Sequence, residues 1–294
     1  MITNRSIRKL WPCLICFIMG LGASSVIVKI TSADHLIAQQ KEPPFPMSWR
    51  LGSNLYMQTA AEYRACCLQI YQCAAMRLET MLQTNAHNYA KPAVVMDLDE
   101  TVFDNSAFQS FLYRSKREYT ESDWEVFERD FYDEVALVPG AKSFIENAES
   151  KGVTVRYISN RLEEHRQSTI KALAGLGINT KNIDGRLLLK SKGASSNKSS
   201  RRETVETGSN VLLYIGDNLR DFSETFAAPK FEPGDQGALL RAMQIRFARV
   251  DEAGCHWGVD WFVLPNPLYG EWEKLLGEQP MSELRTTRMN LSSK

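Results

Sequence analysis

Short apolar runs alternate with helical segments along most of the chain, and this alternation limits the possible folds more than any other feature of the sequence. Apolar runs typical of strands cover residues 93–96, 153–159, 186–189, 211–216 and 259–264. Helical segments between them cover about 140–150, 163–175 and 199–206. Strands that are apolar throughout are buried on both faces. The pattern therefore predicts an α/β fold, a Rossmann-like parallel sheet with helices on both faces.

Three segments do not belong to this alternation. Residues 54–82 have apolar side chains at helical spacing and contain no Gly or Pro, which predicts one long amphipathic helix packed against the core. Residues 104–138 are rich in aromatic and acidic side chains, and we expect them to form a small helical cap. Residues 227–258 are expected to be an irregular insertion.

The N-terminus has the features of an export signal. Three basic residues precede a nearly uncharged run over 10–28, and small residues at 31–33 offer a cleavage site, so a signal peptide over 1–33 is favoured. The run is also just long enough to span a bilayer, so an uncleaved membrane anchor remains the alternative. Either way we expect an exported protein, periplasmic or attached to the cell envelope. Residues 34–50 would be a tether, and 51–294 the folded domain.

The overall charge argues against a polyanionic partner. The chain has 35 Lys and Arg and 35 Asp and Glu, so its formal net charge is +0. A balanced chain has no global field to attract a nucleic-acid polymer. Any specificity for an anion must therefore come from a local site on the protein, which would bind a small molecule.

Polar and charged residues follow the predicted strands at the points where function collects in such sheets. Asp97, Asp99 and Glu100 follow the run 93–96, and like charges this close resist burial unless a cation belongs among them. Polar groups after the other strands are Ser159, Asn160 and Arg161, then Asp217 and Asp221, and the basic stretch 190–202. A site that handles a metal or a phosphate is the prediction.

These motifs together resemble the class C acid phosphatases of the haloacid dehalogenase (HAD)-like superfamily, a family that includes lipoprotein-type 5'-nucleotidases. The resemblance covers roughly residues 49–275 and is carried by the segments "KPAVVMDLDETVFDNS", "VPGAKSFIENAESKGVTVRYISNR", "LLYIGDNLRDF" and "FVLPNPLYGEWE". It implies a HAD-like sheet with a small helical cap and a phosphomonoesterase that uses Mg²⁺. Neither Cys13 nor Cys16 has the small preceding residues of a lipoprotein cysteine.

Phosphate monoesters are dianions, so a carboxylate can attack phosphorus only where cations neutralise the charge between them. Asp97 is the expected nucleophile, and the resemblance implies an aspartyl-phosphate intermediate. Asp99 would protonate the leaving oxygen and later take a proton from the attacking water, which makes an acidic optimum natural. Mg²⁺ would be held by oxygen ligands from Asp97 and Asp217, with the backbone carbonyl of Asp99 implied by the family and Asp221 ordering metal waters or holding a lysine.

Phosphate oxygens would be held by the Ser159 hydroxyl and the backbone N–H of Asn160, just after the strand, as a hydroxyl and an amide at a helix start can do. Lys198 is favoured as the phosphate lysine because it opens a helix-start pattern like that of the family, 19 residues before Asp217. Lys190 and Lys192 remain alternatives.

Substrate choice rests on aromatic residues. Trp124 and Tyr269 occupy positions that match motifs whose aromatic rings, in the resembled family, stack on a nucleobase or aryl leaving group. Nucleoside 5'-monophosphates and aryl phosphates are the expected substrates. The alternatives are a noncatalytic surface or storage protein that retains the HAD-like fold, and an enzyme that mainly transfers phosphoryl groups to alcohols. The sequence does not indicate an oligomeric state.

Overall fold

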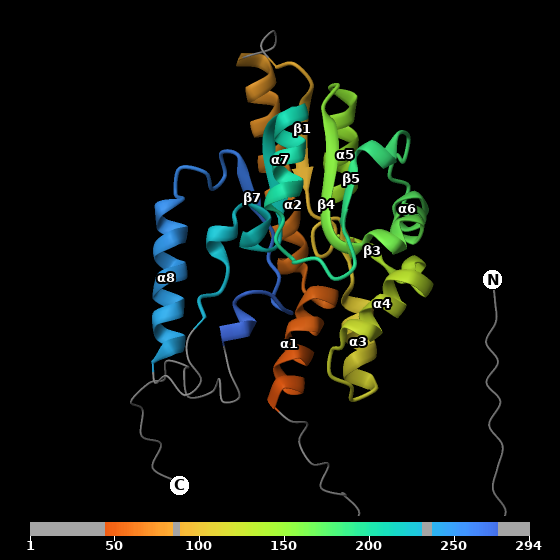
Figure 1. Ribbon diagram of the computed structural model, residues 1–294, viewed down its shortest axis with the longest axis vertical. Helices are drawn as coiled ribbons and strands as arrows, with labels where there is room; N and C mark the ends of the chain where they lie inside the picture. The colour runs from red at the N-terminus through yellow and green to blue at the C-terminus, as the bar shows by residue number, and fades with distance from the viewer. Residues whose placement is uncertain (1–44, 85–88, 231–236, 276–294) are drawn as a thin grey trace, which may run out of the picture. The chain divides into compact units, whose positions relative to one another are not determined.

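The computed structural model describes residues 45–84, 89–230 and 237–275. Its centre is a five-stranded sheet in the order β5-β4-β1-β6-β7, and every neighbouring pair is parallel (Figure 1). The strands are β1 (Pro92–Met96), β4 (Thr154–Leu162), β5 (Leu187–Lys190), β6 (Asn210–Gly216) and β7 (Trp261–Val263). Each overlaps an apolar run of the sequence, so the predicted parallel α/β sheet is confirmed.

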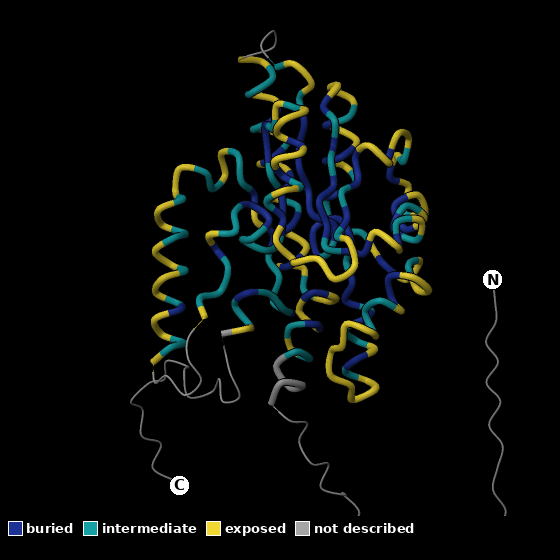
Figure 2. Tube along the Cα trace, viewed as in Figure 1, coloured by how far each residue is buried: buried dark blue, intermediate teal, exposed yellow. Residues whose placement is uncertain are grey.

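Helices cover both faces of this sheet, because successive residues of a strand point to opposite sides. Val94 and Met96 of β1 belong to the main apolar cluster, together with side chains of α2 (Ala61–Thr84) and α5 (Ala141–Ser150). Val95 points the other way and packs with Val205 of α7 (Ser199–Gly208). Helix α6 (Arg166–Gly175) contributes Ala172 and Leu173 to the main cluster. The strands are accordingly the most buried part of the chain (Figure 2).

The segment between β1 and α5 forms a small helical unit at one end of the sheet. It contains α3 (Ser106–Arg114) and α4 (Glu121–Asp130) and is closed at its base by two short antiparallel strands, β2 (Phe103–Asp104) and β3 (Ala136–Leu137). Its aromatic residues pack on one another and join the main apolar cluster, with the ring centroid of Phe108 5.3 Å from that of Trp124 and 4.9 Å from that of Phe127. In Figure 1 both helices lie beyond the end of the sheet toward which the β1 arrow points.

The predicted single helix over 54–82 is wrong in one respect. The chain forms two helices, α1 (Phe45–Thr59) and α2, which are separated at Ala60. The two helices have different partners: Asn54 and Gln58 of α1 bind Ser110 on α3, whereas α2 packs on α5 and the sheet. The break lets one segment follow two surfaces, and no Gly or Pro in the sequence signals it.

Two further expectations need correction. Residues 227–258 are not irregular throughout, because they include the 15-residue helix α8 (Ala238–Glu252), whose side chains Leu240 and Phe247 are exposed. The expected tether is helical over residues 45–50, and its remainder, with the expected signal peptide or anchor, lies outside the described residues. Among the described helices, none has both the length and the apolar character needed to cross a membrane.

Candidate active site

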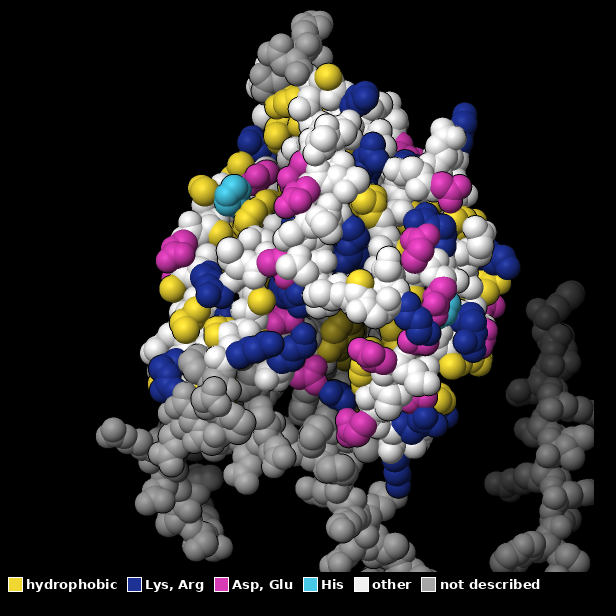
Figure 3. Space-filling model, viewed as in Figure 1, with side chains coloured by type: hydrophobic (Ala, Val, Ile, Leu, Met, Phe, Trp, Pro, Cys, Tyr) yellow, Lys and Arg dark blue, Asp and Glu magenta, His cyan; other side chains and the backbone are white. Residues whose placement is uncertain are grey.

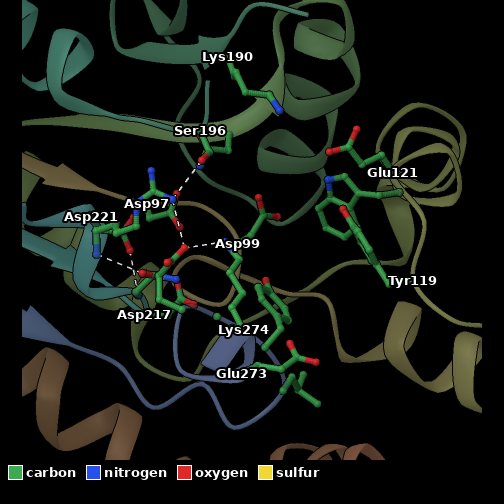
Figure 4. Close-up of a pocket in the computed structure, with 18 of the residues that line it drawn as sticks. Asp97, Asp99, Tyr119, Glu121, Lys190, Ser196, Asp217, Asp221, Glu273 and Lys274 are labelled. Atoms are coloured by element: carbon green, nitrogen blue, oxygen red, sulfur yellow. Dashed lines mark hydrogen bonds and ion pairs between the residues drawn. The ribbon is translucent and has the colours of Figure 1, made fainter. Parts of the chain in front are cut away.

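The turn after β1 places two carboxylates at the edge of a pocket. The backbone N–H of Asp97 still bonds the carbonyl of Ile215 on β6 at 3.0 Å, so Asp97 is held as an extension of the strand. The chain then turns sharply, with the Leu98 carbonyl accepting from Val102 and Phe103 and with Glu100 at a φ of 53°. A positive φ at a non-glycine residue is a strained conformation that is common at functional sites. Asp97 and Asp99 both line the same cavity, of about 430 Å³ (Figure 4).

A buried lysine joins two of the predicted site aspartates. The Nζ atom of Lys198 lies 2.7 Å from Asp97 Oδ1 and 2.7 Å from Asp221 Oδ1, and all three side chains are buried. Lys198 directly precedes α7, and its backbone N–H donates to Glu224, which fixes the loop that carries it. Asp221 closes the short helix η5 (Leu219–Asp221).

Of the three candidate lysines, Lys198 is the one whose ammonium group reaches the carboxylates. Lys190 also lines the pocket, but no ion pair between it and Asp97 or Asp221 is seen. Lys192 is exposed and pairs with Glu125 and Glu164. These positions favour Lys198 among the alternatives that the sequence left open.

Three carboxylates converge in a set that fits a divalent cation. Oxygens of Asp97, Asp217 and Asp221 lie within 4.8 Å of one another. Asp217 Oδ2 accepts a bond of 2.7 Å from the amide of Asn266, which orients it. Lys198 supplies a single positive charge next to three carboxyl groups, so the cluster can take up further positive charge when these groups ionise. A set of carboxylate oxygens is the donor chemistry that Mg²⁺ prefers.

The charges of this cluster perturb one another. Burial raises the pKa of Asp97 to about 7, against the opposing pull of Lys198 and with a contribution from Asp221. Burial, together with the charges of Asp221 and Asp97, raises the pKa of Asp217 well above its ordinary value. For Lys198 burial acts to lower the pKa, but its ion pairs with Asp221 and Asp97 prevail and raise it. The lysine is therefore a permanent cation at the bottom of the pocket.

Asp99 is held separately from this cluster. Its Oδ1 atom accepts from Arg161 Nε at 2.8 Å and from Asn105 Nδ2 at 3.0 Å, and its Oδ2 atom lies 3.3 Å from the Ser159 hydroxyl. Arg161 and Asn105 are both fully buried. The side chain of Asp99 keeps 16% of its surface exposed toward the pocket.

The predicted phosphate-binding pair, Ser159 and Asn160, lies within β4, which extends past the strand end expected at residue 159. No helix starts at Ser159 or Asn160, because β4 continues to Leu162 and is followed by the short helix η3 (Glu163–His165) before α6. Ser159 is fully buried, and its hydroxyl contacts Asp99 and the backbone N–H of Arg161. Asn160 lines the pocket, with its amide oxygen bonded to Arg201.

The two predicted stacking residues line the same pocket from different elements. Trp124 comes from α4, and Tyr269 from the loop after β7. Both are partly buried against the main core, so each combines a packing role with a surface that faces the cavity. Tyr119 also lines the cavity, and Figure 4 shows it across the pocket from the aspartates.

Four residues of this site received no role from the sequence: Asn105, Arg161, Gly216 and Asn266. Each lies inside a segment that the motifs already marked, but the sequence of a motif does not show which other side chain such a residue will contact. Gly216 shows why, because a Cβ at this position would lie only 2.6 Å from the Cβ of Asp221. The close approach that glycine allows here depends on the path of η5.

Comparisons with known proteins agree with this geometry. The family model of the HAD superfamily, subfamily IIIB (acid phosphatase), matches residues 22–272. The solved structure of the class C acid phosphatase from Bacillus anthracis is 31% identical, with a TM-score of 0.67, and the match covers 79% of this chain and 90% of that one. A second structure of the class C enzyme from that organism, with tungstate bound, is 29% identical, with a TM-score of 0.69 and coverage of 82% and 98%.

The family model spans most of the chain. Residues 22–272 contain β1 through β7 and all the aspartates of the pocket. The expected resemblance is confirmed, and a phosphomonoesterase is indicated rather than a noncatalytic protein. The chain belongs to the acid phosphatases of subfamily IIIB of the HAD superfamily.

Proposed function

We propose that this acid phosphatase is an exported, Mg²⁺-dependent enzyme that hydrolyses nucleoside 5'-monophosphates and aryl phosphates through an aspartyl-phosphate intermediate on Asp97. The observation that carries the proposal is the buried Lys198, bonded at 2.7 Å to both Asp97 and Asp221 beside the third carboxylate, Asp217. A nucleophilic carboxylate beside a fixed cation suits attack on a dianion.

Asp97 attacks phosphorus, and the bond to the leaving oxygen breaks. Lys198 reduces the repulsion between the carboxylate and the incoming phosphate from a position that its bonds to two buried carboxylates already fix. Asp99 donates a proton to the leaving oxygen. It then takes a proton from the water that hydrolyses the aspartyl-phosphate, so one residue serves as acid and then as base. Asn160 lies at the pocket wall, where its backbone N–H is proposed to contact the phosphate, with Ser159 behind it.

Asp97, Asp217 and Asp221 would hold Mg²⁺, with the carbonyl of Asp99 as a further ligand. When bound, the ion neutralises phosphate charge and so assists attack by an anion. Asn266 orients Asp217 for this role through its bond of 2.7 Å. The excess of negative charge in a buried cluster supports a divalent cation.

Trp124 and Tyr269 support the choice of substrates with planar groups. Both line a cavity of about 430 Å³, which is within the size range of small-molecule sites. Stacking accepts any flat ring, so both nucleotides and aryl phosphates are expected substrates. Basic and acidic side chains are interspersed on the face in Figure 3, which fits a small substrate better than a nucleic-acid polymer.

Export is supported by the N-terminal basic and apolar segment of the sequence. Cell fractionation separates the possibilities. Release with the soluble periplasmic fraction indicates a cleaved signal, whereas recovery with membranes indicates a retained anchor. Activity confined to the cytoplasm contradicts export.

The test of the catalytic proposal is phosphate release from adenosine 5'-monophosphate and p-nitrophenyl phosphate across pH, with Mg²⁺ or EDTA. Asp97→Asn keeps the shape of the side chain but removes its charge, so turnover should fall by a factor on the order of 10³ or more. Asp251→Asn, on the exposed surface of α8, is the matched control and should retain activity. Wild-type turnover in folded Asp97→Asn contradicts the proposal, and undiminished turnover in EDTA contradicts the metal requirement.

A further inference from the structure

Arg161 is the largest of the fully buried side chains in the described part of the chain, and none of its surface is exposed. Burying a guanidinium is unfavourable unless charged and hydrogen-bonding partners compensate for the lost water. The position of this arginine therefore requires specific partners. They are found at Asp99, the proposed acid of the site.

Arg161 and Asn105 together saturate one oxygen of Asp99. Nε and Nη2 of Arg161 both lie 2.8 Å from Asp99 Oδ1, and Asn105 Nδ2 donates to the same oxygen at 3.0 Å. Arg161 Nη2 also donates to Asn105 Oδ1 at 3.0 Å, so the three side chains form a closed ring of bonds. The other oxygen, Oδ2, has only a long contact of 3.3 Å with Ser159. The two oxygens of the carboxyl group are thus not equivalent.

The guanidinium is itself fixed from several sides. Its central carbon lies 4.8 Å from the ring centroid of Phe103 and 5.4 Å from that of Trp124, which are cation–π distances. The backbone N–H of Arg161 also donates to the Ser159 hydroxyl at 3.0 Å, and this hydroxyl contacts Asp99 in turn. A planar cation held in this way gives its partner a fixed direction.

We propose that Arg161 is a positioning residue for the acid step. It holds Asp99 through Oδ1, which leaves Oδ2, with its single long contact, to deliver the proton to the leaving oxygen. In that step Asp97 forms a bond to phosphorus, the ester P–O bond breaks, and the proton of Asp99 moves to the departing oxygen. This inference rests on the proposed role of Asp99 as the acid.

The proposal makes a prediction that depends on the leaving group. The nitrophenolate ion is a weak base and departs without a proton, whereas the alkoxide of a nucleoside is a strong base and needs one. The ratio kcat/KM covers only the steps up to the departure of the leaving group, because hydrolysis of the aspartyl-phosphate comes later. A misdirected Asp99 should therefore lower kcat/KM for adenosine 5'-monophosphate far more than for p-nitrophenyl phosphate.

The experiment compares kcat/KM for these two substrates in the full-length wild-type protein, Arg161→Met and Arg161→Lys, with folding checked by circular dichroism. Relative to wild type, Arg161→Met should raise the aryl-to-nucleotide ratio at least about tenfold, since acid catalysis contributes about 10² to 10⁴. Arg161→Lys keeps the charge but not the two-nitrogen geometry, so its ratio should also rise. Arg186→Met is the matched control, because Arg186 is a buried arginine that pairs with Glu149 away from the pocket, and it should leave the ratio unchanged.

Asp99→Asn separates failure of this inference from failure of the proposed function. If Asp99→Asn raises the ratio but folded Arg161→Met and Arg161→Lys do not, the positioning role is overturned and the acid role stands. If Asp99→Asn also leaves the ratio unchanged, both are overturned. Should Arg161→Met fail to fold, Arg161→Lys decides alone, and a wild-type ratio in that variant overturns the inference.

Discussion

Gly216→Ala should displace Asp221 and thereby weaken both the fold and the active site. A Cβ on residue 216 would lie 2.6 Å from the Cβ of Asp221 and 2.8 Å from its Cγ, whereas real Cβ contacts are essentially never under 3.0 Å. The Oδ2 atom of Asp221 would lie closer still, so Asp221 must retreat by at least about 0.4 Å to reach that limit, and by at least about 0.8 Å to reach an ordinary contact of 3.4 Å.

Asp221 has no spare freedom for this movement. Its Oδ1 atom is bonded to Lys198 at 2.7 Å, and its Oδ2 atom accepts from the backbone N–H of Asn218 at 2.9 Å. Overpacking of this kind costs about 1 to 3 kcal/mol, and the loss or stretching of a charge-assisted bond brings the expected decrease in the free energy of unfolding to about 2 to 3 kcal/mol. For a domain of this size the melting temperature should fall by about 5 to 10 °C.

The catalytic loss should exceed the loss of stability, because a displacement approaching 1 Å at a reacting centre costs up to about a hundredfold in rate. We expect kcat/KM for p-nitrophenyl phosphate to fall about tenfold to hundredfold, measured well below the melting temperature, together with weaker Mg²⁺ binding. Gly175→Ala at the end of α6 is the control, since nothing lies within 4 Å of its Cβ position. A Gly216→Ala enzyme with wild-type stability, metal affinity and activity would refute the reasoning.

Three further predictions concern pH, the metal and the substrate. In EDTA the free energy of unfolding should fall as the pH rises from the ordinary carboxyl pKa of 3.8 to about 7, because burial raises the pKa of Asp97 and the folded state keeps a proton that the unfolded chain releases. Thermal melts in EDTA check this, and a melting temperature that rises over that interval contradicts it. Asn266→Ala should weaken Mg²⁺ binding about tenfold to hundredfold in a calorimetric titration, because Asp217 loses its orienting bond of 2.7 Å; unchanged affinity would argue against the assigned metal set. Tyr269→Leu should lower kcat/KM for adenosine 5'-monophosphate by about tenfold, in line with stacking energies of about 1 to 3 kcal/mol per base, and leave methyl phosphate unaffected. Equal losses on both substrates would count against stacking.

The strands and the strand-end motifs could be predicted because they depend on local sequence. A strand buried on both faces must be apolar along its length, so β1, β4 and β6 are visible without any knowledge of their neighbours. Parallel strands bring their carboxyl ends to one edge, which is why Asp97 and Asp217 could be placed together although they are far apart in the sequence.

Errors arose where packing decided the outcome. The break at Ala60 and the helix α8 both depend on the surfaces that neighbouring segments offer for packing. Helical periodicity in the sequence does not predict those surfaces. The predicted strand end at residue 159 was too early for a related reason, because β4 continues to Leu162 alongside β5.

The sequence by itself determined the parallel α/β sheet and the aspartates at its strand ends, since both follow from the pattern of apolar and charged residues along the chain. The sequence favoured Lys198 as the cation but left Lys190 and Lys192 open, and only the tertiary structure decided among them, because Lys198 lies 101 residues from Asp97 and its reach depends on how the loop before α7 is held. The same is true of Arg161, whose buried ring of bonds with Asp99 and Asn105 joins two strand ends. Such contacts depend on how close two side chains lie after folding. The number of residues between them in the sequence does not determine that distance.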